Sequence, residues 1–198
     1  MTYDLAYGLL SEAHKNLYGW CSEEKSKYLF DLVLNIKPEL ITEIGIYRGR
    51  SLASFSAASL IHKCDVVGID PYNFDCLINE TYTNKEDLEY SKNLFITEFH
   101  RLGLPFILID KPSEIAINND IFFNKKIDIL HIDGSHNEHH VCLDIKLWLP
   151  KLKVNGILIF DDANYLSIQL AQEIALEKCI HIEYIEGYKT RILKKISE

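Results

Sequence analysis

Three aspartates stand directly after short apolar runs that predict strands, the position where α/β proteins place their chemistry. Asp133 follows one such run, and the pair Asp161 and Asp162 follows another. Neighbouring strands lie about 4.8 Å apart, so acids at the ends of two adjacent parallel strands converge. Close carboxylates repel unless a cation neutralises them, and oxygen ligands suit Mg²⁺, Mn²⁺ or Ca²⁺. The pattern predicts a divalent-metal site on Asp133, Asp161 and Asp162, although one of the pair could instead cap a helix over residues 165–178.

A histidine lies three residues beyond Asp133, at the mouth of the same turn. A neutral imidazole at such a place can accept a proton near neutral pH, so His136 is the candidate general base and Asp133 its competitor. Ser135 and Glu138 form a Ser-x-x-Glu pattern, which predicts that Ser135 caps the next helix. His131, inside the preceding strand, is more typical of a buried and hydrogen-bonded histidine than of a ligand.

A glycine-containing turn lies between an apolar run and a helical pattern over residues 52–61. The turn reads Glu-x-Gly-x-x-x-Gly-x-Ser and includes Glu43, Gly45, Gly49 and Ser51. It differs from the nicotinamide-binding Gly-x-Gly-x-x-Gly and from a P-loop, so it suits a cofactor without phosphates. Glu43 could hold the turn or reach a cationic amino group, and Ser51 is expected to cap the following helix.

Two further residues complete a candidate nucleoside site. Asp70 ends the next predicted strand, 25 residues after Gly45. At about this position a carboxylate accepts hydrogen bonds from both ribose hydroxyls. Ser113 follows the third strand, where an adenine edge would lie, and capping of a helix at residues 114–118 is an equal alternative.

The elements that would position these residues alternate between strand and helix patterns from residue 40 onward. The expected strands are Leu40–Gly45, Asp65–Asp70, Phe106–Asp110, Ile127–Asp133, Gly156–Asp161, His181–Glu186 and Thr190–Lys195. The helices between them are expected near 51–62, 84–101, 113–119, 137–149 and 165–178. Such alternation predicts an α/β fold with a mainly parallel seven-stranded sheet and helices on both faces. Only a Gly-Tyr link separates the last two strands, so they form an antiparallel pair.

Outside this region, residues 1–37 predict two helices, over 3–18 and 23–36, as an N-terminal extension of a domain at 38–198. The polar segment from Pro71 to Asp87 is expected to form a loop over the site. We see no internal repeat or linker that argues for a second core.

Composition narrows the class of protein. The chain has 198 residues, 47% of them hydrophobic, and a net charge of −8, which disfavours nucleic acid or an anionic membrane as the main partner. Five cysteines without C-x-x-C spacing are typical of a reduced, cytoplasmic protein. The sequence predicts neither a signal peptide nor a membrane span.

These motifs together resemble one family. The resemblance covers about residues 38–165 and is carried by Glu43-Ile44-Gly45-x3-Gly49-x-Ser51, Gly68-Ile69-Asp70, His131-Ile132-Asp133-Gly134-Ser135-His136 and Trp148-Leu149-Pro150-x3-Val154-Asn155-Gly156-x3-Phe160-Asp161-Asp162. The chain resembles class I S-adenosylmethionine-dependent methyltransferases, which have a Rossmann-like sheet. It looks closest to the macrocin, mycinamicin and novobiocin sugar O-methyltransferases and the cephalosporin-hydroxylase-like proteins.

The resemblance implies cofactor contacts from the first two motifs. Gly45, Gly49 and Ser51 would lie against the methionine part of S-adenosylmethionine, and Asp70 would bind the ribose. Ser113 would stand near the adenine, although Lys111-Pro112-Ser113 departs from the family's Gly-Asp/Glu-Ser element.

The later motifs imply a metal and a base. Asp133, which also lines the cofactor site, matches the family's magnesium ligands together with Asp161 and Asp162, and His136 matches the base of some members. In related enzymes the region before residue 38 shapes the acceptor pocket or an oligomer contact.

The leading hypothesis is therefore a magnesium-assisted O-methyltransferase of a sugar or other small-molecule hydroxyl, and a homo-oligomer is possible. The rival enzyme class is a nicotinamide-dependent oxidoreductase, which shares the strand, turn and ribose acid but needs the Gly-x-Gly-x-x-Gly that this chain lacks. A third hypothesis is a non-catalytic cofactor-binding subunit, against which the intact acids and His136 speak.

Overall fold

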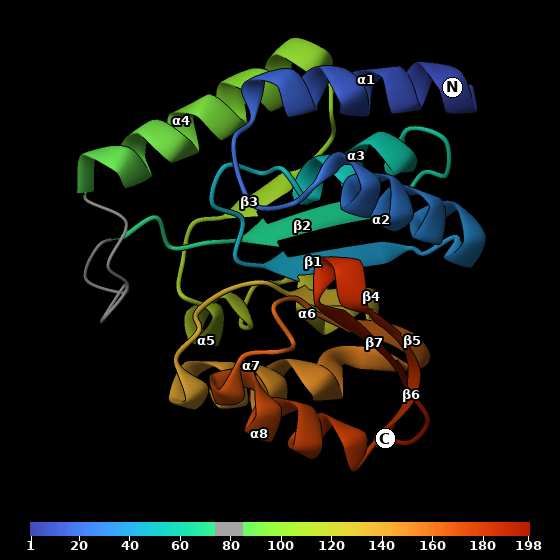
Figure 1. Ribbon diagram of the computed structural model, residues 1–198, viewed down its shortest axis with the longest axis vertical. Helices are drawn as coiled ribbons and strands as arrows, with labels where there is room; N and C mark the ends of the chain where they lie inside the picture. The colour runs from blue at the N-terminus through green and yellow to red at the C-terminus, as the bar shows by residue number, and fades with distance from the viewer. Residues whose placement is uncertain (74–84) are drawn as a thin grey trace.

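The computed structural model describes residues 1–73 and 85–198, and its centre is a seven-stranded sheet (Figure 1). The strand order is β3-β2-β1-β4-β5-β7-β6. The first five strands pair in parallel, and β7 is antiparallel to both of its neighbours. The strands are β1 Leu40–Ile44, β2 Asp65–Ile69, β3 Ile107–Ile109, β4 Ile127–Ile132, β5 Leu152–Phe160, β6 Cys179–Ile185 and β7 Thr190–Lys195. The expected Rossmann-like fold is confirmed.

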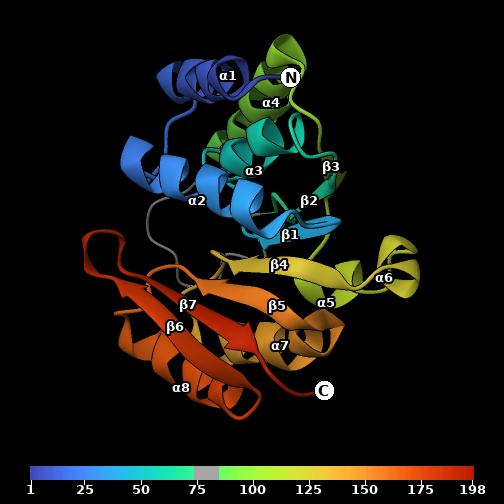
Figure 2. The same ribbon diagram turned by 90° about the vertical axis from the view of Figure 1, so that its right-hand side faces the viewer.

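Helices cover both faces of this sheet (Figure 2). One face carries α1 Tyr3–Asn16, α2 Glu23–Ile36, α3 Leu52–Ser59 and α4 Lys85–Leu102. The opposite face carries α5 Ser113–Ala116, α6 Ile121–Asn124, α7 Glu138–Trp148 and α8 Leu166–Leu176. Each face has its own hydrophobic core, because strand residues alternate between the two sides.

The register of the central strands brings the candidate residues to one edge and one face. Glu43 of β1 is the partner of His131 of β4, and both side chains point to the face that α2 and α3 cover. The next residues of the strands continue the pairing: the Asp133 amide donates to the Ile44 carbonyl (2.8 Å), and the Asp161 amide donates to the Ile132 carbonyl (3.0 Å). Asp133 and Asp161 therefore stand side by side at the carboxyl ends of β4 and β5.

The N-terminal helices belong to the core of that face. The Ser22 hydroxyl caps α2 by accepting from the Lys25 amide (3.1 Å), and Lys37 in left-handed conformation (φ 55°) ends the helix. Leu29, Phe30 and Val33 of α2 are fully buried against the sheet and α3. Residues 1–37 thus pack continuously with the sheet domain.

Several local expectations were wrong. Ser51 has helical angles and makes no capping bond. Asn137, which accepts from the His139 amide, caps α7 in place of Ser135, whose hydroxyl accepts from the Asn137 amide. The strand expected at 156–161 begins earlier, at Leu152, and α6 and two 3-10 turns, Leu149–Lys151 and Glu186–Tyr188, were not expected. Of the loop expected from Pro71 to Asp87, residues 74–84 lie outside the described part of the chain. Within the described ranges, no helix combines the length and apolarity needed to cross a bilayer.

Candidate active site

The two glycines of the turn after β1 meet different constraints. Gly45 has φ +89°, and a Cβ there would overlap the backbone carbonyl of Asp133. Gly49 has φ +76°, and a Cβ there would strike the Phe95 ring of α4. Gly45 therefore permits the close approach of the β1 turn to the end of β4, whereas Gly49 permits the packing of α4. A Cβ at Gly49 would point at aromatic rings of the core, a constraint that the sequence pattern did not indicate.

Asp70 holds this turn in place. One carboxylate oxygen accepts from the Ile46 and Tyr47 amides, and the other accepts from the Tyr72 amide, all at 2.9 Å. Burial raises the pKa of Asp70 above its usual value, and the three amide donors oppose that rise. Two of the three donor residues, Tyr47 (φ 49°) and Tyr72 (φ 42°), have left-handed backbone angles. The acid that was expected to bind ribose thus supports the glycine turn.

Glu43 and His131 form a fully buried pair. Glu43 Oε1 lies 2.9 Å from His131 Nδ1, and the histidine ring packs edge-on against Phe55 of α3. The second atoms of the pair, Glu43 Oε2 and His131 Nε2, have no hydrogen-bond partner among the described residues. Within the described residues, the three metal-ligating side chains whose donor atoms come within 4.8 Å of one another are Glu43, His131 and Asp133.

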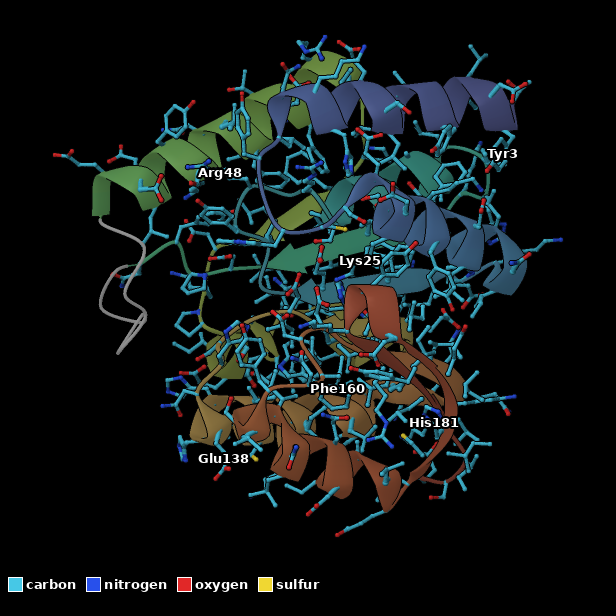
Figure 3. The ribbon with its side chains drawn as sticks, in the orientation of Figure 1. Tyr3, Lys25, Arg48, Glu138, Phe160 and His181 are labelled. Atoms are coloured by element: carbon cyan, nitrogen blue, oxygen red, sulfur yellow. The ribbon has the colours of Figure 1, made fainter. Side chains whose placement is uncertain are left out.

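A lysine that the sequence analysis did not select enters the acidic cluster. Lys25 of α2, labelled in Figure 3, is 4% exposed and forms an ion pair with Asp161 beneath the helix. Burial lowers the pKa of Lys25, but the charges of Asp133 and Asp161 outweigh it and hold the pKa above its usual value. The signal that could have found it is helical spacing, since Lys25 stands on the same stripe as buried Leu29 and Val33.

The pKa values of the two strand-end acids, Asp133 and Asp161, are shifted in opposite directions. Burial and the neighbouring Asp161 raise the pKa of Asp133 well above its usual value, against the pull of Lys25. Burial also raises the pKa of Asp161, but the charges of Lys25 and His131 outweigh it and hold that pKa below the usual value. The Lys25 ammonium, in contact with Asp161, therefore favours the ionised form of that carboxyl.

Asp162 turns away from that pair. It has left-handed backbone angles (φ 46°), and its carboxylate Oδ2 lies 3.1 Å from His136 Nε2. The His136 ring also stacks on Tyr165, with centroids 4.7 Å apart and planes at 18°. The predicted metal ligands are thus divided: Asp133 and Asp161 face Lys25, and Asp162 faces His136.

His136 and the two inner acids share a cavity. It lies between the ends of β4 and β5 and is lined by Ile132, Asp133, Gly134, Ser135, His136, Val141, Phe160, Asp161 and Ile168. The structure therefore brings the candidate base and the acid pair to one place at the carboxyl edge of the sheet.

Ser113 and Ser51 do not line that cavity. The Ser113 hydroxyl, at the first residue of α5, donates to the carboxylate of Asp144 on α7. Ser51 is 4% exposed at the start of α3. The adenine contact expected of Ser113 and the methionine contact expected of Ser51 stay predictions.

The segment between α1 and α2 lies against the glycine turn. Trp20, 84% exposed, stacks on Tyr47 with centroids 5.3 Å apart. Arg50 donates to the Gly19 carbonyl (3.4 Å) and to Nδ1 of buried His14 (3.0 Å). The N-terminal helices therefore help to build the site as well as the core.

Comparison with known proteins decides the family. A family model described as a methyltransferase domain matches residues 42–163, more than half of the chain. The chain belongs to this methyltransferase-domain family. The family expected from the sequence, that of S-adenosylmethionine-dependent methyltransferases, is confirmed, and the finer likeness to macrocin-type enzymes stays a prediction.

Solved structures agree on the fold. PaMTH1, a methyltransferase of Podospora anserina with bound S-adenosylhomocysteine (SAH), has a TM-score of 0.68 at 15% identity over 98% of this chain and 88% of its own. An O-methyltransferase from Bacillus cereus in complex with SAH gives 0.66 and 15% over 100% and 92%. CalS11, a TDP-rhamnose 3′-O-methyltransferase of calicheamicin biosynthesis, gives 0.61 and 16% over 96% and 93%.

Among curated proteins, the uncharacterized protein y4gI of Sinorhizobium fredii (strain NBRC 101917 / NGR234) is 25% identical over 134 residues. The match covers 66% of this chain and 14% of that protein, so the chain spans a small part of that relative.

Proposed function

We propose that this methyltransferase moves the methyl group of S-adenosylmethionine to a hydroxyl of a sugar or another small molecule. The observation that carries the proposal is the His136–Asp162 pair beside a cavity at the carboxyl edge of the sheet, next to the glycine turn. The family match supports methyl transfer, and the named activities of the Bacillus cereus enzyme and CalS11 support oxygen as the acceptor atom.

The cofactor would lie along the ends of β1, β2 and β4. We assign the ribose to Asp70, whose carboxylate has about four acceptor positions, three of which hold the turn. The methionine part would lie on the backbone of the turn between Gly45 and Ser51, with the carboxyl groups of Glu43 and Asp133 toward its ammonium group. Gly49 would act through the shape of the turn, and Ser113 would approach the adenine only if it leaves Asp144.

Proton removal falls to His136. Its Nε2 is directed at Asp162, and a carboxylate partner favours the tautomer with the proton on that nitrogen. The basic nitrogen is then Nδ1, which takes the proton of the acceptor hydroxyl. The hydroxyl oxygen forms a bond to the methyl carbon while the carbon–sulfur bond breaks, and the sulfonium becomes a neutral thioether. Rate comes mainly from holding oxygen, carbon and sulfur in line.

The predicted magnesium site needs Asp133, Asp161 and Asp162 to converge, and these residues do not fit it. Lys25 engages Asp161, and Asp162 bonds His136. The group of Glu43, His131 and Asp133 has suitable spacing, and Glu43 Oε2 and His131 Nε2 have no other partner among the described residues, so it is a separate candidate metal site that does not include Asp161 or Asp162. No step of the proposed mechanism is routed through a metal ion.

The N-terminal helices would bound the acceptor pocket. Trp20 and Tyr47 present stacked rings beside the glycine turn, and such rings suit the apolar face of a sugar or an aromatic acceptor. A homo-oligomer contact through residues 1–37 and a cytoplasmic location remain parts of the proposal. The finer likeness to macrocin-type sugar methyltransferases also belongs here.

Calorimetry with S-adenosylmethionine, SAH and NAD⁺ tests the cofactor class. We expect the first two to bind and NAD⁺ to give no heat, and binding of NAD⁺ alone would restore the oxidoreductase hypothesis. A mass-spectrometric screen with methyl-labelled cofactor over sugars, nucleotide sugars and catechols then tests catalysis. Binding without any labelled product across the screen would favour the non-catalytic subunit.

A further inference from the structure

The positive charge beside Asp133 and Asp161 comes from a side chain of this protein, that of Lys25. We propose that the Lys25 ammonium, delivered by α2, permanently occupies the place between the ends of β4 and β5 where a divalent ion would sit, so that this enzyme neither binds nor needs a metal there. The statement about turnover rests on the proposed function, and the statement about metal binding does not.

Burial and charge make the lysine a fixture of the site. An ammonium that is 4% exposed is tolerated in a protein only when anions surround it. Lys25 has two, Asp161 in direct contact and Asp133 close enough to act on its charge. The ammonium offsets the charge of Asp161, with which it is in contact, and so weakens the carboxylate repulsion that would otherwise draw a metal ion.

Three carboxylate oxygens of the predicted ligands, both of Asp161 and one of Asp162, already have partners within the protein. Asp161 Oδ2 receives the Lys25 ammonium, and Asp161 Oδ1 accepts from the Asp162 amide (3.0 Å) and the Thr190 hydroxyl (3.2 Å). Asp162 Oδ2 faces His136. An octahedral ion requires several oxygens at about 2.1 Å, so these bonds would have to break for it to enter.

The helix that carries Lys25 is held on several sides. Ser22 caps it, and Ser26 bonds both His14 Nε2 (2.6 Å) and Cys21 Sγ (3.2 Å). One turn further, Leu29 is fully buried in the core. These contacts hold α2, and with it the backbone of Lys25, against the sheet.

The experiment measures Mn²⁺ binding by electron paramagnetic resonance and calorimetry in the full chain. Lys25→Met removes the charge and keeps an unbranched side chain, Lys25→Arg keeps the charge, and Lys27→Met is the matched control, because Lys27 lies on the same helix but is exposed and paired with Asp31. We expect wild type, Lys25→Arg and Lys27→Met to bind Mn²⁺ only weakly. Lys25→Met should bind at least about tenfold more tightly, a gain that Asp133→Asn in the same chain abolishes.

Two results would overturn the proposal. One is tight Mn²⁺ binding by wild type that Asp161→Asn removes. The other is a folded Lys25→Met chain with the Mn²⁺ affinity of wild type. If Lys25→Met fails to fold, the wild-type measurement still decides, and the double change Lys25→Met/Asp161→Asn, which removes the ion pair as a whole, is expected to fold and to bind Mn²⁺ weakly.

SAH binding in the presence of EDTA separates this proposal from the proposed function. Wild type should bind SAH with the same affinity with and without EDTA, and turnover, once an acceptor is found, should change less than about twofold. Loss of turnover in EDTA with unchanged SAH binding would overturn metal independence alone. Absence of SAH binding in every condition would instead overturn the proposed function.

Discussion

Replacing Asp70 by alanine should loosen the glycine turn even when no cofactor is present. The carboxylate accepts three backbone N–H groups, those of Ile46, Tyr47 and Tyr72, each at 2.9 Å. A residue that only bound ribose would leave the unliganded protein unchanged when it is removed. Because Asp70 also supports the turn, its loss should lower both stability and cofactor affinity.

The magnitude follows from the three donors. An amide left without its partner costs about 1–3 kcal/mol when buried, and Tyr47 and Tyr72 are only partly buried, so about 1 kcal/mol each is the appropriate figure. The raised pKa shows that burial of the carboxylate opposes folding, which offsets part of the sum. We expect Asp70→Ala to lower the free energy of unfolding by about 2–3 kcal/mol, and Tm by roughly 4–12 °C for a chain of this length.

Urea denaturation without cofactor and calorimetry with SAH measure the two effects separately. Asp110→Ala is the control for stability, since Asp110 also ends a parallel strand but pairs with Lys92 at an exposed position, where the expected loss is below about 1 kcal/mol. SAH affinity of Asp70→Ala should fall by about tenfold to a hundredfold. Unchanged stability together with the weaker binding would refute the supporting role and leave a pure ribose ligand.

Three further predictions follow from single side chains. His136→Gln should reduce turnover by about a hundredfold or more and leave SAH affinity within about twofold, and near wild-type turnover over pH 6 to 9 would pass the role of base to Asp133. Burial raises the pKa of Asp144 from 3.8 to about 6, which means that the folded state favours the protonated carboxyl. This stabilisation of the fold is complete below the unfolded pKa and is lost as pH rises through about 6. Asp144→Asn should therefore gain about 3 kcal/mol near neutral pH in urea denaturation and abolish the slope between about pH 4 and 6, an effect absent if Asp144 is ionised at little cost. Gly45→Ala should unfold the turn or lower the free energy of unfolding by at least about 3 kcal/mol. The control Gly8→Ala should raise it by about 1 kcal/mol, because Gly8 is exposed on α1 and a Cβ there would meet nothing within 4 Å. Equal thermal stability of the two variants would contradict this prediction.

The sequence predicted the sheet well because its signals are local and repeated. Each buried strand is a short apolar run, and each crossover leaves a helical period between two runs. The two-residue link before β7 already required an antiparallel partner. What local signals cannot state is which strands are neighbours: β7 enters between β5 and β6, so the strand that carries Lys195 is interior, and that lysine is fully buried with its ammonium on the Leu149 and Leu152 carbonyls.

The positions of the site residues were predictable from the strand ends, and their partners were not. Strand endings placed Asp70, Asp133 and His136 at one edge of the sheet. The capping roles of Ser51 and Ser135 failed, because Ser51 already has helical backbone angles and helix α7 begins at Glu138, three residues after Ser135. Capping patterns fix the start of a helix only within a residue or two.

Asp161 and Asp162 show why adjacent acids cannot be counted as one set of ligands. In an extended strand they would already point to opposite faces, and the left-handed angle of Asp162 then directs its carboxylate to His136. Two adjacent aspartates thus have different partners: Asp161 pairs with Lys25, and Asp162 bonds His136.

A cluster of acids in a sequence indicates that a positive charge must lie nearby, but it does not indicate which group carries that charge. A metal ion and a buried ammonium meet the same need, and the ammonium here comes from a helix 136 residues away from Asp161 along the chain. Lys25 lies on the apolar stripe of α2, where a charged residue is costly unless it finds a counter-charge beneath the helix. A lysine on a buried stripe in a chain with unpaired strand-end acids is therefore the pattern to search for, because each feature supplies what the other lacks.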